Sequence, residues 1–151
     1  MEVILVSACL LGVNCKYNAG NNLNKEAIKL LESELVIPVC PEQLGGCPTP
    51  RIPAEITGGS GADVLDGKNR VMTKNGEDRT EEFLKGANEV LMLARLMRVK
   101  KAVLKARSPS CGSGTIYDGT FSGALKAGNG ITAELLKRNG IEVVSEEELR
   151  P

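Results

Sequence analysis

The chain has 151 residues, with 19 basic side chains, 19 acidic side chains and no histidine. This length fits one domain over residues 1–151 that buries roughly 70% of the unfolded chain's surface without disulfides. The balanced charge argues against a protein that coats nucleic acid, and the missing histidine excludes Ser-His-Asp and Cys-His catalysis. No apolar run reaches the roughly 18–20 residues of a membrane span and no secretory leader precedes the first strand, so we expect a cytoplasmic protein.

The first third of the chain alternates apolar runs with polar segments. Val3–Ala8 is a continuous apolar run, as expected of a strand buried on both faces. Gly12–Asn22 has the composition of a loop. Asn24 is a typical helix N-cap before the helical spacing of Glu26–Leu31, and Leu35–Val39 indicates a second strand.

The middle of the chain begins with the long segment Cys40–Ile56, which is rich in proline and glycine. Long ordered loops in compact domains are usually functional. We then predict a hairpin in which Asp63–Leu65 and Arg70–Thr73 flank an Asp-Gly turn. Glu77–Val99 has the apolar spacing of a long core-facing helix, and Ala102–Ala106 indicates a third main strand.

The last third contains a second long loop, Ser108–Gly123, which is rich in glycine. Ile131–Arg138 is a predicted helix ended by Asn139-Gly140, and Ile141–Val144 is the final predicted strand. Strands that alternate with helices favour a three-layer α/β fold with a mostly parallel, Rossmann-like sheet. The long cysteine-bearing loops then lie at the carboxyl ends of its strands.

Three of the five cysteines lie in loops that follow predicted strands: Cys9, Cys40 and Cys111. The carboxyl ends of parallel strands share one edge of a sheet, so these thiols should meet there. A single buried cysteine is usually a small apolar core residue. Three cysteines in equivalent positions instead suggest an iron–sulfur cluster or a soft metal.

Other thiol chemistry remains open from the residues alone. Structural zinc sites favour pairs of cysteines with two to four residues between them, and this chain has no such pair. A thiol nucleophile would need a helix N-terminus or a basic neighbour to become a thiolate. Cys15 shares a loop with Cys9 and is the thiol to consider in place of one of the three.

Glu42 lies two residues after Cys40 and could act as a general acid–base if Cys40 binds a metal. Ser108, before Cys111, could donate a hydrogen bond to a ligand or shape the turn. Arg51 and Arg107 are the basic residues placed nearest the cysteine loops, and Arg107 could hold a ribose or a phosphate.

Three segments carry a family resemblance: SACLLG at Ser7–Gly12, CPEQLGGCPTPRIPAEI at Cys40–Ile56 and SPSCGSGTIYDG at Ser108–Gly119. The sequence resembles the thiouracil desulfidase family in its single-domain form, over essentially the whole chain. The resemblance implies a cytoplasmic α/β enzyme that converts the C=S of a thiolated uracil or uridine to C=O. It also implies a small-molecule substrate: a thiolated nucleobase, nucleoside or nucleotide.

The resemblance assigns roles to the residues that match its motifs. A 4Fe–4S cluster would be held by Cys9, Cys40 and Cys111, with the fourth iron free for the substrate's sulfur. Glu42 would be the acid–base carboxylate, and Ser108 would assist it.

The sequence departs from the family at two places. Lys16–Gly20 replaces a common Arg-Tyr-Asp-Gly stretch, and Cys47 stands where leucine is common, so we expect no ligand role for Cys47. A non-catalytic cluster-binding or metal-binding module and a thiol-based sulfur carrier are the alternative functions. Aromatic residues are scarce, at 3% of the chain, so stable nucleic-acid binding is not expected.

Overall fold

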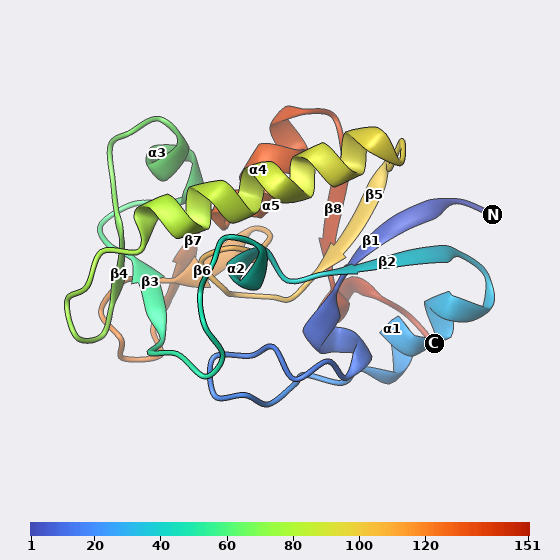
Figure 1. Ribbon diagram of the computed structural model, residues 1–151, viewed down its shortest axis with the longest axis horizontal. Coiled ribbons are helices and arrows are strands. Elements are labelled where there is room, and N and C mark those ends of the chain that lie inside the picture. The colour runs from blue at the N-terminus through green and yellow to red at the C-terminus, as the bar shows by residue number, and fades with distance from the viewer.

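In the computed structural model, which describes residues 1–151, four parallel strands form the central sheet in the order β2-β1-β5-β8. These strands are β1 (Val3–Ser7), β2 (Leu35–Val39), β5 (Lys101–Leu104) and β8 (Glu142–Ser145). Helices α4 (Thr80–Leu96) and α5 (Ile131–Arg138) cover one face of the sheet (Figure 1). Helix α1 (Lys25–Lys29) packs on the other face. The predicted three-layer α/β fold is confirmed.

The central strands are buried on both faces, which explains their unbroken apolar sequences. Leu5 of β1 packs in the core under α4 and α5, whereas its neighbours Ile4 and Val6 pack in the core on the α1 side. This alternation follows from the two-residue period of a strand. Each fully buried aliphatic side chain contributes about 1.5–3 kcal/mol, so β1 anchors both layers.

Several predicted elements match the structure closely. β1 and β2 occupy nearly the predicted residues, and α5 occupies the predicted ones. Asn24 caps α1, because its Oδ1 accepts a hydrogen bond from the Ala27 amide at 3.0 Å. Pro38 is tolerated inside β2 because this strand lies at an edge of the sheet, where one row of amides needs no partner.

The predicted hairpin of Asp63–Leu65 and Arg70–Thr73 is wrong in its first strand. Residues Gly61–Leu65 form helix α3, which begins with a capping interaction between Ser60 and the Asp63 carboxylate. β4 (Val71–Thr73) pairs instead with β3 (Ala54–Ile56), antiparallel and outside the central sheet. Asp66-Gly67 does form a turn, as predicted. The strand after it, β4, finds its partner in β3, which lies farther away along the chain.

The two long predicted loops contain short elements. The first holds helix α2 (Pro41–Leu44) and strand β3, and the second begins the ribbon of β6 (Thr115–Tyr117) with β7 (Leu125–Ala127). Three 3₁₀ helices complete the chain: η1 (Ala8–Leu11), η2 (Leu30–Glu32) and η3 (Glu146–Glu148).

Helix α2 is held against α4 by two glycines that face each other. A Cβ atom on Gly45 would collide with the Glu82 carbonyl oxygen, and one on Gly86 would collide with the Pro41 carbonyl oxygen. The two backbones therefore approach more closely than any side chain would allow. This contact fixes α2, and with it the position of Glu42.

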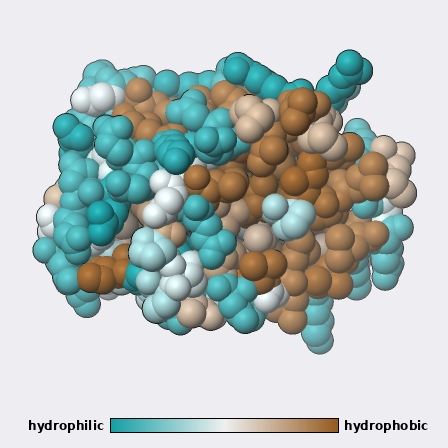
Figure 2. Space-filling view, viewed as in Figure 1, coloured by the Kyte–Doolittle hydropathy of each residue, from teal (hydrophilic) through white to brown (hydrophobic).

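One part of the surface is notably apolar. Figure 2 shows apolar residues over the part of this face where β2 and the C-terminal end of α4 lie. Leu35 of β2 is 54% exposed and Leu96 of α4 is 70% exposed. No helix in the structure is both long and apolar enough to cross a membrane.

We expect Gly86→Ala to lower the free energy of unfolding by about 1–3 kcal/mol, the usual cost of overpacking. In an ordinary helix interior, replacing glycine by alanine stabilises the protein by roughly 0.5–1 kcal/mol. The sign of the change in unfolding free energy therefore distinguishes a tight contact from an ordinary helix position. Urea unfolding measures the difference. Lys85→Ala, at an exposed neighbouring position, is the matched control. A Gly86→Ala protein as stable as the wild type would show that the α2–α4 contact is not tight.

Candidate functional site

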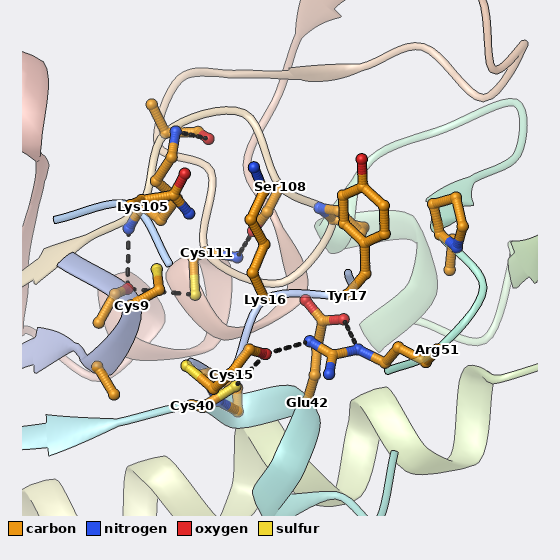
Figure 3. Close-up of a pocket in the computed structure, with 18 of the residues that line it drawn as sticks. Cys9, Cys15, Lys16, Tyr17, Cys40, Glu42, Arg51, Lys105, Ser108 and Cys111 are labelled. Carbon is orange, nitrogen blue, oxygen red and sulfur yellow. Dashed lines mark hydrogen bonds and ion pairs between the residues drawn. The ribbon is translucent and has the colours of Figure 1, made fainter. Parts of the chain in front are cut away.

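A cavity of about 380 Å³ opens at the carboxyl edge of the sheet, where the loops after β1, β2 and β5 meet. The thiols of Cys9, Cys15, Cys40 and Cys111 all line it (Figure 3). All five cysteines of the chain are free. The volume is within the range of small-molecule sites. The prediction that the three strand-end cysteines meet is confirmed, and a fourth thiol lies with them.

Cys9 and Cys40 are partly exposed, and their thiols are the most acidic of the five. Hydrogen bonding with the Cys15 thiol lowers the pKa of each to about 7, against the opposing effect of burial. Cys40 is also the N-cap of α2, where the Gln43 amide further favours its thiolate. Both sulfurs are therefore ready to act as ligands near neutral pH.

Cys111 is buried, and the loop around it is held firmly. Its amide donates to Ser108 Oγ at 2.7 Å, and Ser7 Oγ lies 3.6 Å from its sulfur. Burial raises the pKa of Cys111 to about 12. Ser108 lines the cavity as predicted, and its observed contact shapes the turn that places Cys111. A bound metal would overcome the high pKa, since a coordinating thiol is deprotonated.

Cys15 was predicted only as an alternative ligand, yet it lies among the other thiols. It is 2% exposed, and its pKa is raised by hydrogen bonding with the thiols of Cys40 and Cys9. Its carbonyl accepts a hydrogen bond from Arg51 Nη2 at 2.9 Å. Figure 3 shows the Cys15 and Cys40 side chains next to each other.

Cys47 lies outside this cavity. It packs with Phe83 and Ala87 in the apolar core beneath α4. Burial raises the pKa of Cys47 to about 11, which keeps the thiol neutral. Its position agrees with the expectation that it has no ligand role.

Glu42 and Arg51 form an ion pair inside the cavity, with 3.1 Å between Oε1 and Nε. Their side chains are 20% and 9% exposed. Burial raises the pKa of Glu42, and the Arg51 charge opposes that rise. Arg51 also donates to the Pro48 carbonyl and to Thr49, so its guanidinium is fixed. The carboxylate is thereby held in one orientation at the wall of the cavity that the cysteines also line (Figure 3).

The basic residues at the cavity differ from the prediction. Arg107 does not line the cavity; it pairs with Glu147 at 2.6 Å. Lys105 lines the cavity but pairs with Glu146 at 3.1 Å. Lys16 also lines the cavity and has no carboxylate partner. It is therefore the cation best able to meet an anionic part of a ligand.

Glu55 is a cavity residue that the sequence analysis did not identify. It is only 9% exposed, and its Oε1 accepts hydrogen bonds from the amides of Gly119 and Phe121 at 2.9 and 3.2 Å. These bonds tie the glycine-rich loop to the cavity wall. No local sequence pattern around Glu55, which lies in a proline-rich segment, indicates its contact with the distant residues Gly119 and Phe121.

The donor set fits a polynuclear sulfur-bound cofactor better than a single metal ion. Nowhere in the chain do three or more cysteine or carboxylate side chains converge closely enough to hold one ion. The four thiols instead line a cavity and offer soft sulfur ligands of the kind that hold iron–sulfur clusters.

Comparison with known proteins gives three similarities. The model of the 2-thiouracil desulfurase family matches residues 4–148. A protein of Bacillus subtilis (strain 168) described as uncharacterized protein YbbK is 48% identical over 147 residues, which is 97% of each chain. A solved structure described as [4Fe–4S]-dependent thiouracil desulfidase TudS is 42% identical, with a TM-score of 0.86. That match covers 99% of this chain and 93% of the other.

Proposed function

Because this chain belongs to the 2-thiouracil desulfurase family, we propose that it is a [4Fe–4S]-dependent desulfidase of thiolated uracil or uridine. It converts C=S to C=O and releases sulfide. The observation that carries this proposal is the meeting of strand-end thiols with the partly buried Glu42 carboxylate in a single cavity. The similarity to TudS over nearly the whole chain supports the same reaction.

Cys9, Cys40 and Cys111 are the residues proposed to hold the cluster. They come from the ends of three neighbouring strands, and two of them have a pKa near 7. When bound, the cluster supplies a thiophilic iron that accepts the substrate's sulfur and polarises the carbon attached to it.

Glu42 is proposed to manage the protons of the reaction. Water that adds to the thiocarbonyl carbon must lose protons, and the sulfur that leaves must gain one. Arg51 holds the Glu42 carboxylate at 3.1 Å, so the base is oriented before substrate arrives. Ser108 is proposed to assist by a hydrogen bond to the substrate, from the position where it also shapes the Cys111 turn.

The cavity suits a substrate the size of a base, nucleoside or mononucleotide. Its volume is about 380 Å³, and Lys16 with Tyr17 stands at its wall. Lys16 Nζ lies 5.7 Å from the Tyr17 ring centre and is free of carboxylates, so it could bind a single phosphate. The chain's zero net charge provides no overall electrostatic attraction for an RNA strand.

The cluster ligands can be tested by single alanine substitutions. Anaerobically reconstituted wild-type protein should contain iron and sulfide in equal amounts. We expect Cys9→Ala, Cys40→Ala and Cys111→Ala to lose most of both, because each removes a thiolate ligand. Cys47→Ala, which alters a core thiol outside the cavity, should keep them. A Cys111→Ala protein with a full complement of iron would overturn this ligand assignment.

The role of Glu42 can be separated from its ion pair by comparing Glu42→Gln with Glu42→Ala. Glutamine retains an acceptor for Arg51 but cannot transfer the proton. We expect either change to lower kcat by about 10²–10⁴ while iron and sulfide stay bound. Ser108→Ala should lower it less, since one hydrogen bond is lost. Glu81→Gln, at an exposed position of α4, is the control. Unchanged kcat in Glu42→Gln would assign the proton transfers to another group.

Substrate size can be tested by comparing a thiolated base, its nucleoside, its monophosphate and a thiolated transfer RNA. We expect the small molecules to react faster than the RNA. Lys16→Ala should raise KM for the monophosphate about tenfold and leave that for the base unchanged, since a charge-assisted contact contributes on the order of 1.4 kcal/mol. Lys68→Ala, exposed and outside the cavity, is the matched control. Faster turnover of the intact RNA with a steep salt dependence would contradict the size argument.

A further inference from the structure

Cys15 is a buried thiol that the proposed three-cysteine site leaves unused. Free cysteine is usually buried as a small apolar side chain in a core. Cys47 and Cys111 follow that rule, since each belongs to an apolar core cluster. Cys15 is 2% exposed, but it belongs to none of the three core clusters. Its burial comes from the site itself.

The backbone at Cys15 is fixed by the same arginine that orients Glu42. Arg51 Nη2 donates to the Cys15 carbonyl at 2.9 Å, and the Arg51 amide donates to the Tyr17 carbonyl at 2.7 Å. The Cys40 thiol also lies 3.9 Å from the Cys15 carbonyl oxygen. These contacts join the Cys15 loop to the Cys40 segment, so the fourth thiol is held in place.

The Cys15 thiol faces two proposed ligands. It interacts with the thiols of Cys9 and Cys40, which belong to the loops after β1 and β2. Cys111 completes the lining of the same cavity from the β5 side. A [4Fe–4S] cluster has four irons and is commonly bound by four cysteine thiolates. This cavity contains that number of thiols.

We propose that Cys15 is the fourth thiolate ligand of the cluster while no substrate is bound. This inference rests on the proposed function, because it requires a cluster on Cys9, Cys40 and Cys111. When substrate arrives, the bond from iron to the Cys15 sulfur breaks and one bond from iron to the substrate sulfur forms. The released thiolate takes a proton from solvent, and no electron is transferred. Cys15 thus protects the reactive iron until it is needed.

The test uses substrate-free, cluster-loaded protein and a readout other than turnover. Stoichiometric ferricyanide is added without oxygen, and the three-iron cluster formed by loss of an unprotected iron is followed by electron paramagnetic resonance. We expect Cys15→Ala and Cys15→Ser to keep the cluster as prepared but to form the three-iron species at least about tenfold faster than the wild type. Cys47→Ala should behave like the wild type.

Two results would overturn the inference. One is rapid formation of the three-iron species in the wild type, at the rate of the Cys15 variants. That result needs no variant to fold in order to be read. The other is a Cys15→Ser protein that is folded by circular dichroism but assembles no cluster, which would make Cys15 an obligatory ligand. If the wild type assembles no cluster, the iron assay shows that the proposed function itself has failed.

Discussion

The site depends on the parallel pairing of three strands. β1 lies between β2 and β5, so Cys9, Cys40 and Cys111 leave the sheet at the same edge. Ser7, the last residue of β1, joins two of these loops, because its hydroxyl accepts a hydrogen bond from the Lys105 amide at 2.8 Å and contacts the Cys111 sulfur. Antiparallel pairing of any of these strands would send one thiol to the opposite edge.

The chain has no histidine, so arginine, glutamate and cysteine side chains carry the charge interactions around this edge. Arg51 holds both the Glu42 carboxylate and the Cys15 carbonyl, so one guanidinium organises the proton-transfer group and the fourth thiol together. A fork of fixed donors suits this double task better than a flexible lysine. The pKa of each thiol is set by its own surroundings. Hydrogen bonds lower the pKa of Cys9 and Cys40, whereas burial raises that of Cys111.

The sequence allowed prediction of the features that depend on local pattern. Unbroken apolar runs predicted β1 and β2, and the cysteines after them predicted a common thiol site. What it could not give were long-range contacts. The pairing of β3 with β4, the Glu55 bonds to Gly119 and Phe121, and the Arg107–Glu147 pair join residues with no local signal. Helix α3 was missed although Ser60 and Asp63 have the spacing of a capping box.

The C-terminal segment has a consequence for the timing of assembly. Glu146 of η3 accepts the Ala106 amide at 2.8 Å and pairs with Lys105, and β8 flanks β5. The strand that leads to Cys111 is thus supported by residues that are synthesised after it. Cys9 and Cys40 are synthesised long before that support exists. Iron and sulfide should therefore be delivered only after the β8–η3 segment has been synthesised, since a domain's N-terminal part emerges first during synthesis.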